Sequence, residues 1–241
     1  MQKYVVKNID RPSDQLLIEY KKLDVSTVYE AQSKQGILSP RLKPILQNTM
    51  IVGPAVTVIC PAGDNLMIHA AIEVCKPGDV LVITTEGEGI AGMIGELIVT
   101  ALMKKGVQGV VMDAGIRDVR QIRELGFPIW TREVLSQGTN KMKGGWVNAP
   151  AICGGVSIAP GDLIMADDDG IVVVKKEDFE STLELSKARV AKEAGTIEKI
   201  ESGQISVDFY NLRPVLEAEG VVYYETEQER QLAQNGVKQN G

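Results

Sequence analysis

Residues 80–118 read VLVITTEGEGIAGMIGELIVTALMKKGVQGVVMDAGIRD. This segment is the clearest indication of the fold class. Two short apolar runs, 80–84 and 109–112, have the composition of buried parallel strands. The segment between them, 94–105, has the apolar spacing of a helix. A connection of this length between neighbouring strands makes them run parallel. The carboxyl ends of both strands should therefore lie at the same edge of a sheet.

An unusual loop follows each of these strands. The first, 85–95, is rich in glycine and leads into the helix, so that backbone N–H groups of its first turn can face an anion. The second, 113–118, ends in Arg117 and Asp118, which offer a planar fork for a carboxylate and an oxygen ligand for a hard cation. Ligands of open α/β sheets bind beyond the carboxyl ends of strands. We therefore expect both loops to line one crevice that suits a substrate with more than one carboxylate.

Each loop taken alone has a plainer interpretation. The glycine-rich loop is then a turn without a ligand, and Arg117 and Asp118 form a surface ion pair in which Asp118 caps the next helix. Their shared position at one sheet edge is what favours a site. The run 167–170, Asp-Asp-Asp-Gly, is typical of a hairpin turn rather than of a metal cluster.

The chain contains one histidine, His69, which lies in a predicted helix over 65–75 among apolar residues and is expected to be structural. One histidine cannot supply a multi-histidine metal site within a chain. A metal would depend on carboxylate oxygens and water, which favours Mg²⁺ or Mn²⁺ over zinc. Lys141 is expected either in solvent or along a cleft, and Glu193 is most simply a surface residue.

Composition narrows the classes of partner. The 241 residues carry a formal net charge of −6, which argues against nucleic acid or an anionic membrane as the main partner. The three cysteines fit no zinc spacing and are expected to be reduced and buried. No apolar run is long enough to span a bilayer, and no export signal is recognisable at the start. We therefore expect a cytoplasmic protein.

The remaining segments predict an α/β catalytic domain over 1–175, a helical C-terminal extension over 176–225 and a polar, mobile tail over 226–241. The pattern of the catalytic domain predicts two N-terminal helices, the second capped by Ser26, and a strand over 50–60 with a kink at Gly53. It continues with a helix over 119–125, a strand over 128–130 and a β-rich part over 134–175.

Residues 92–98, GMIGELI, and 113–119, DAGIRDV, together resemble the signature of one superfamily. It comprises the class II aldolases for 4-hydroxy-4-methyl-2-oxoglutarate and 4-carboxy-4-hydroxy-2-oxoadipate, grouped with the regulator of ribonuclease activity A proteins. PAGDN at 61–65, PGD at 160–162 and ADDDG at 166–170 also look like landmarks of this superfamily. The resemblance implies a swivelling α/β/α domain with a central mixed sheet. It also implies Mg²⁺ or Mn²⁺ as cofactor and a homotrimer or homohexamer.

The resemblance also implies roles for individual residues. Asp118 would be the direct metal ligand, and Arg117 would contact the substrate and the developing oxyanion. Glu96 would orient metal-bound water, and Glu193 would reach the outer shell of the metal from a neighbouring subunit. The remaining substrate contacts would come from Lys141 and from the backbone that binds the pyruvyl carboxylate, namely Gly95, Glu96, Leu97 and Ile98.

The activity implied is retro-aldol cleavage of either substrate to pyruvate and a second 2-oxo acid, with oxaloacetate decarboxylation as a side reaction. The main alternative is a non-catalytic regulator that binds a protein partner, because both branches share the Arg-Asp pair. The extension over 176–224 favours the aldolase, since the regulators compared are shorter. A methyltransferase is disfavoured because the glycine-rich loop lacks the strand-end acidic residue that such a cofactor site needs.

Overall fold

The computed structural model describes residues 2–87 and 91–239, and its core is a mixed β-sheet. The central strands β3, β4, β6 and β7 run parallel, whereas β8 pairs antiparallel with β3 and β2 with β7. This mixed sheet with flanking helices confirms the predicted α/β class. The strand order is β1 (Tyr4–Val5), β8 (Trp146–Val147), β3 (Ile51–Pro61), β4 (Val80–Glu86), β6 (Gly109–Ile116), β7 (Ile129–Val134) and β2 (Lys43–Pro44).

The unit β4–α4–β6 has the parallel arrangement that the sequence predicts. Val80 lies opposite Gly109, and α4 (Glu96–Lys104) forms the crossover between the two strands. The strand β6 is longer than expected and runs on through Ile116, so residues 113–116 are strand and not loop. The reason is an additional strand, β5 (Gly92–Ile94), which emerges from the glycine-rich loop and pairs with the end of β6. Residues 88–90 of that loop lie outside the described residues.

The strand β3 changes partners along its length. Its first residues, up to Pro54, pair with β11 (Leu163–Ala166), which also pairs with β12 (Ile171–Val174). From Ala55 onward it pairs with β4. The kink expected at Gly53 is therefore a change of partner within one continuous strand. At Gly53 the strand passes close to the loop that precedes β4, because a Cβ on Gly53 would lie 2.2 Å from the carbonyl oxygen of Gly78.

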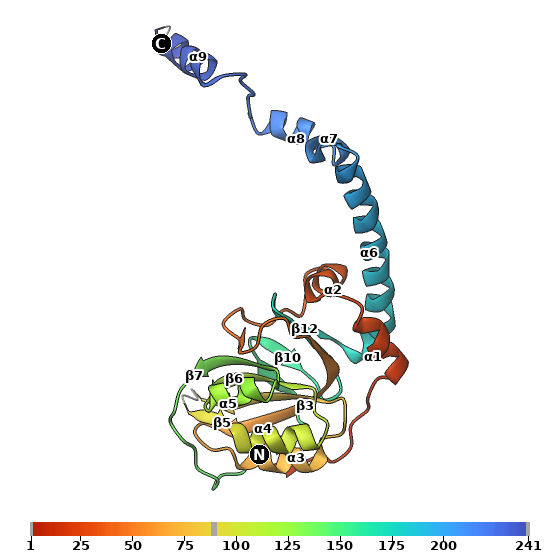
Figure 1. Ribbon diagram of the computed structural model, residues 1–241, viewed down its shortest axis with the longest axis vertical. Coiled ribbons are helices and arrows are strands. Elements are labelled where there is room, and N and C mark those ends of the chain that lie inside the picture. The colour runs from red at the N-terminus through yellow and green to blue at the C-terminus, as the bar shows by residue number, and fades with distance from the viewer. Residues whose placement is uncertain (1, 88–90, 240–241) are drawn as a thin grey trace. The chain divides into compact units, whose positions relative to one another are not determined.

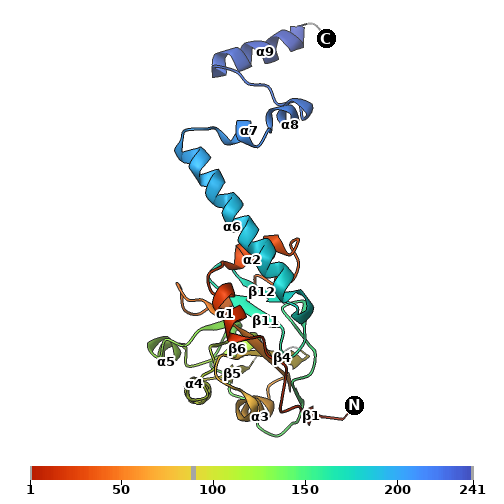
Figure 2. The ribbon, with the colours of Figure 1, turned by 90° about the vertical axis from the view of Figure 1, so that its right-hand side faces the viewer.

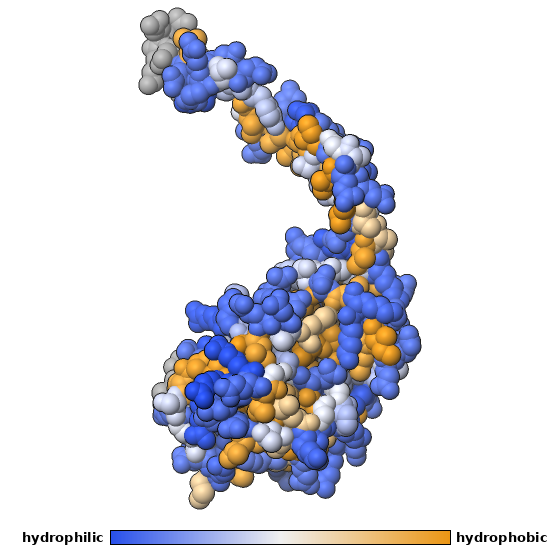
Figure 3. All heavy atoms as spheres, viewed as in Figure 1, coloured by the Kyte–Doolittle hydropathy of each residue, from blue (hydrophilic) through white to orange (hydrophobic). Residues whose placement is uncertain are grey.

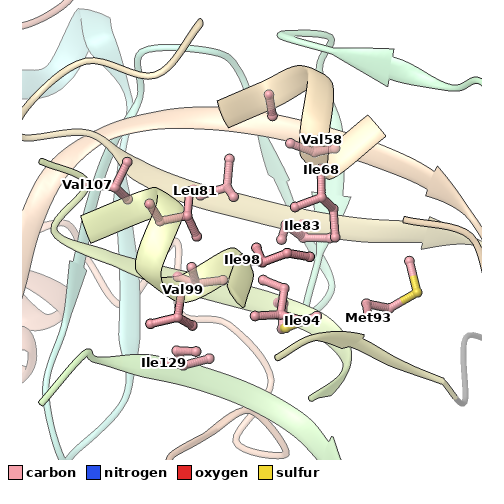
Figure 4. Close-up of a cluster of buried hydrophobic side chains, with 14 of the residues drawn as sticks. Val58, Ile68, Leu81, Ile83, Met93, Ile94, Ile98, Val99, Val107 and Ile129 are labelled. Carbon is pink, nitrogen blue, oxygen red and sulfur yellow. The ribbon is translucent and has the colours of Figure 1, made fainter. Parts of the chain in front are cut away.

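The ribbon views show elements on both faces of the sheet (Figures 1 and 2), and buried side chains pack on each face. On one face, α3 (Leu66–Val74), α4 and α5 (Val119–Glu124) cover a cluster of buried aliphatic residues. Figure 4 shows this cluster, in which Ile68 of α3 and Val99 of α4 lie over the strand residues Leu81 and Ile83. The opposite face packs against β11, β12 and the small ribbon of β9 (Ala151–Cys153) and β10 (Val156–Ile158). Because both faces of the sheet are covered, ligands can reach the strands only at their ends.

The N-terminal helices α1 (Asp14–Tyr20) and α2 (Val25–Ala31) pack on β11 and β12. Ser13 caps α1, because its hydroxyl accepts the N–H of Leu16 at 3.3 Å. Ser26 does not cap α2, because it lies inside the helix. The helix starts one residue earlier, and the carboxylate of Asp167 accepts the Val25 N–H at 3.0 Å. Asp167 also begins the hairpin turn between β11 and β12, which confirms the turn predicted there.

The chain divides into two compact units, 1–190 and 191–241, with the boundary inside α6 (Phe179–Glu201), which follows the short 3-10 helix η1 (Lys176–Asp178). The second unit contains α7 (Ser206–Phe209), α8 (Arg213–Ala218) and α9 (Glu227–Gln239). The segment predicted as a polar tail therefore contains a helix. Large apolar side chains of this unit are exposed among hydrophilic ones (Figure 3), including Ile197, Ile205 and Val222.

Three cysteines are buried and unpaired, as expected, and burial raises the pKa of each thiol to about 12. Reactive thiols need a lowered pKa and some exposure, so these side chains fill the core rather than perform chemistry. Among the described helices, none is long and apolar enough to cross a lipid bilayer.

Candidate active site

A cavity of about 410 Å³ opens at the carboxyl edge of the parallel strands, and we call it the edge cavity. It brings together the two loops that the sequence predicts to meet. The start of α4 forms one part of its wall, and the junction of β6 and α5 forms another. The predicted site residues that line it are Gly95, Glu96, Leu97, Ile98, Arg117, Asp118 and Lys141.

Asp118 has an unusual backbone conformation at this edge. Its φ of 57° lies in the left-handed region, which aspartate tolerates better than most residues. It occupies the N-cap position of α5 but makes no side-chain capping bond there. Its Oδ2 instead accepts the N–H of Glu96, at the start of α4, at 3.2 Å. The carboxylate is therefore turned away from its own helix and toward the cavity.

Arg117 is fixed through its backbone, whereas its side chain makes a long ion pair with Asp118. Its N–H donates to the carbonyl of Ile94 at 2.9 Å, which ties the end of β6 to β5. Its Nε lies 3.8 Å from Oδ2 of Asp118, and the two side chains are 47% and 40% exposed. An ion pair this long and this exposed contributes little to stability. Its guanidinium N–H groups therefore remain available for a carboxylate or an oxyanion.

Gly95 permits the close approach of the two loops. Its φ of −138° is ordinary extended backbone, so conformation does not require glycine here. Space does, because a Cβ would lie 2.2 Å from Asp118 Oδ2 and 3.1 Å from Arg117 Nε. The absence of a side chain at position 95 is what lets the Asp118 carboxylate reach the Glu96 amide.

The first turn of α4 offers fewer free amides than its sequence predicts. Glu96 donates its N–H to Asp118, and Ile98 donates to the carbonyl of Gly95 at 3.1 Å. Within the described part of the chain, the N–H groups of Gly95 and Leu97 have no backbone hydrogen-bond partner. These two amides are the donors that remain for an anion, with the positive end of the helix dipole behind them.

Lys141 reaches the cavity from a loop that Asp64 holds in place. The buried carboxylate of Asp64 accepts N–H groups from Met142 at 2.7 Å, Lys143 at 3.0 Å and Leu66 at 3.0 Å. Burial by itself raises the pKa of Asp64, but these three donors outweigh it, and the pKa lies below its ordinary value. Asp64 thus joins the loop of Lys141 to the start of α3.

Comparison with known proteins places this arrangement in a family. Residues 24–173 match the RraA-like family, described as Aldolase/RraA. The chain belongs to this family. It is 32% identical over 194 residues to a protein of Halalkalibacterium halodurans named "Putative 4-hydroxy-4-methyl-2-oxoglutarate aldolase", covering 80% of this chain and 92% of that one.

Solved structures of similar fold agree with the family assignment. An uncharacterized protein from Pseudomonas syringae superposes with a TM-score of 0.74 at 25% identity, covering 81% of this chain and 92% of that chain. Streptomyces coelicolor RraAS2, described as an unusual member of the RNase ES inhibitor RraA protein family, gives a TM-score of 0.69 at 27% identity. That match covers 81% of this chain and 99% of that one. The family thus includes proteins named for an enzyme and proteins named for inhibition.

Four further residues of this Aldolase/RraA chain line the edge cavity without having been predicted there: Asn65, His69, Met93 and Gln121. The sequence predicts a structural His69 among apolar residues, whereas the side chain is exposed and lines the cavity. Ile68 and Ala71 of α3 are buried in the core, whereas His69 points outward to the edge cavity. The spacing of four residues between Asn65 and His69 was the sequence signal for a shared face.

The residues at the cavity mouth fit a hard divalent cation. Asp118 and Glu96 supply carboxylate oxygens, the ligand type that Mg²⁺ and Mn²⁺ prefer. Within 2–87 and 91–239, three or more His, Cys, Asp or Glu side chains nowhere gather as a metal cluster. An ion here would therefore take few ligands from this chain and complete its shell with water or substrate. Glu193 lies in α6 beyond residue 190 and is not among the residues lining the cavity.

Proposed function

We propose that this Aldolase/RraA chain is a divalent-metal-dependent aldolase. Its substrate would be 4-hydroxy-4-methyl-2-oxoglutarate or 4-carboxy-4-hydroxy-2-oxoadipate, cleaved to pyruvate and a second 2-oxo acid, either pyruvate or oxaloacetate. The observation that carries the proposal is the exposed Arg117–Asp118 couple beside the free amides of α4 in one cavity. The name of the Halalkalibacterium halodurans relative supports the same reaction.

Each wall of the edge cavity has a role in this reaction. Mg²⁺ or Mn²⁺, when bound, supplies a Lewis acid for the 2-oxo group, and Asp118 is the residue that holds it. The amides of Gly95 and Leu97 bind the pyruvyl carboxylate at the start of α4. Arg117 offsets the negative charge that grows on oxygen as the carbon–carbon bond breaks. Lys141 binds the carboxylate at the far end of the substrate.

The proton of the C4 hydroxyl has to leave during cleavage. The exposed carboxylate of Glu96 lies at the cavity mouth and orients the water that accepts this proton. Glu193 of a neighbouring copy would help to orient the same water. This contribution implies an assembly, a homotrimer or a homohexamer, in which one chain completes the site of the next. Light scattering of the purified protein would measure that state.

The decisive experiment is a pyruvate-release assay with oxaloacetate and with 4-hydroxy-4-methyl-2-oxoglutarate, each with and without Mg²⁺ or Mn²⁺. Metal-dependent turnover of both substrates is expected, because aldol cleavage and decarboxylation both leave pyruvate as an enolate. In the same assay, Arg117→Ala is expected to lose about 2.7–4 kcal/mol of transition-state stabilisation, as for other oxyanion donors. Wild-type turnover by Arg117→Ala would contradict its role.

A non-catalytic regulator is the second candidate, because the Streptomyces coelicolor neighbour is described as belonging to an inhibitor family. The same assay separates the two. Absence of metal-dependent turnover on either substrate would favour a regulator that binds a protein partner.

A further inference from the structure

The side chain of Asn65 is incompletely bonded although it is buried. Asn65 stands at the N-terminus of α3, is 5% exposed, and lines the edge cavity. Its Nδ2 donates to the carbonyl oxygen of Met93 at 2.9 Å. Its Oδ1 has no hydrogen-bond partner among the residues that the structure describes. Buried polar atoms are nearly always paired, so this acceptor needs a partner other than the described residues, and a ligand in the edge cavity can supply it.

The chemistry of that missing partner is restricted. Donation to Met93 fixes the carboxamide in one orientation, because its nitrogen must face a carbonyl oxygen. The atom left for a ligand is therefore an acceptor, and only an O–H or N–H group satisfies it. The carboxylates and the 2-oxo group of the proposed substrate are acceptors as well. At neutral pH its only donor is the hydroxyl at C4.

We propose that Asn65 binds the C4 hydroxyl of the aldol substrate and selects 4-hydroxy-2-oxo acids over 2-oxo acids that lack this group. The inference rests on the proposed function and extends it to substrate selection. A carboxamide is not a base, so Asn65 only accepts the O–H hydrogen bond of the bound substrate. The hydroxyl then has to turn from Asn65 to the water beside Glu96, which takes the proton as the carbon–carbon bond breaks. A site built around a hydroxyl discriminates against analogues without it, since the buried acceptor then stays unpaired.

Met93 connects this contact to the pyruvyl half of the site. Its carbonyl receives the Asn65 amide, and Gly95 follows two residues later with the amides that bind the pyruvyl carboxylate. The hydrogen bond to Met93 thus ties the Asn65 side chain to the segment that leads into Gly95. A purely structural role through Met93 would affect every substrate, whereas hydroxyl binding affects only hydroxylated ones.

Asn148 provides a matched control. It is also 5% exposed, donates its Nδ2 to the carbonyl of Val6 at 2.8 Å, and has an unpaired Oδ1 among the described residues. It does not line the edge cavity. Its φ of 56° is left-handed, so glycine is the replacement that removes the side chain with least strain.

The experiment measures kcat/KM of the full-length protein with Mg²⁺ or Mn²⁺ on 4-hydroxy-4-methyl-2-oxoglutarate and on oxaloacetate, which has no hydroxyl in its keto form. Asn65→Ala and Asn65→Ser are expected to lose about tenfold or more on the hydroxylated substrate. Decarboxylation of oxaloacetate should change by less than about threefold. Asn148→Gly should leave the ratio of the two activities unchanged.

Equal losses on both substrates would overturn the proposal in favour of structural support through Met93, and no loss on either would overturn it as well. If both Asn65 variants fail to fold, the wild-type protein provides the test. Inhibition by 2-oxoglutarate should then be about tenfold weaker than binding of 4-hydroxy-2-oxoglutarate, and equal affinity would refute hydroxyl recognition. A wild-type protein inactive on both substrates would instead refute the aldolase, and this inference with it.

Discussion

Two arginine–aspartate pairs lie at opposite ends of the parallel strands. Asp79 immediately precedes β4. Arg11 donates to both oxygens of the Asp79 carboxylate, from Nε at 2.7 Å and from Nη2 at 2.9 Å. Asp79 is fully buried and also accepts the N–H of Lys76 at 2.7 Å. Asp118 lies beyond β6 at the other end, and its ion pair with Arg117 is 3.8 Å long.

The same two residue types have different roles in these pairs: one pair stabilises the fold, and the other is available for a ligand. Arg11 and Asp79 direct their hydrogen bonds to each other and to nearby backbone, so little capacity remains for a ligand. Arg117 and Asp118 are half exposed and weakly coupled, so their charges face the cavity. Burial and completeness of hydrogen bonding separate the two roles.

The largest effect is expected from Asp118→Asn. Asparagine tolerates the left-handed backbone and keeps the size of the side chain but removes the charge that would hold a cation. Turnover should fall to background while the thermal melting temperature changes little. The measurement pairs pyruvate release with a melting curve. A variant that retains metal-dependent activity would show that Asp118 is no metal ligand.

Arg11→Ala should produce the opposite pattern. It leaves Asp79 buried without its partner, which typically costs about 3–5 kcal/mol in the free energy of unfolding. Denaturant titration measures this loss, and the specific activity of the folded fraction should stay near that of the wild type. The comparison of the two pairs fails if Arg11→Ala loses activity without losing stability.

Gly95→Ala tests the spacing of the functional pair. The added Cβ would lie 2.2 Å from Asp118 Oδ2, so the carboxylate has to move away from the Glu96 amide. A displacement of about 1 Å can cost on the order of 100-fold in rate, and a loss of this size is expected for kcat. Gly138→Ala is the control, because its Cβ would meet only Arg117 Nη1 at an ordinary 3.8 Å. Equal activities for the two variants would show that Gly95 is not required for spacing.

Asp64 combines features of the two pairs: it lies at the edge that carries the cavity, and it is buried like Asp79. Its folded pKa is lowered from the ordinary value of 3.8. Its contribution to stability is therefore present above that value and is lost as the pH falls through the lower folded pKa. Asp64→Asn should lower the free energy of unfolding at neutral pH, on the order of 1 kcal/mol, and reduce its dependence on pH below about 4. Unchanged acid dependence in Asp64→Asn would contradict this.

Local pattern was sufficient for much of the fold. The apolar runs at 80–84 and 109–112 and the helix between them predict two parallel strands with a common carboxyl edge, and that edge carries the cavity. Local pattern was insufficient where a strand or a helix end depends on a hydrogen-bond partner from a distant part of the sequence. The short strand β5 exists because it pairs with β6, and α2 starts at Val25 because Asp167 accepts its N–H across 142 positions.

The sequence by itself determined the crossover, the pairing of a glycine-rich loop with Arg117 and Asp118, and the oxygen-rich character of the site. These depend on hydrophobic periodicity and residue chemistry, which act over a few turns of chain. Three features needed the folded structure: Asp118 turns toward Glu96, Asp64 holds the loop of Lys141, and Asn65 Oδ1 is unpaired among the described residues. Each of these features depends on which hydrogen bonds form between residues that are distant in the sequence. The geometry and the burial of the folded chain determine those bonds.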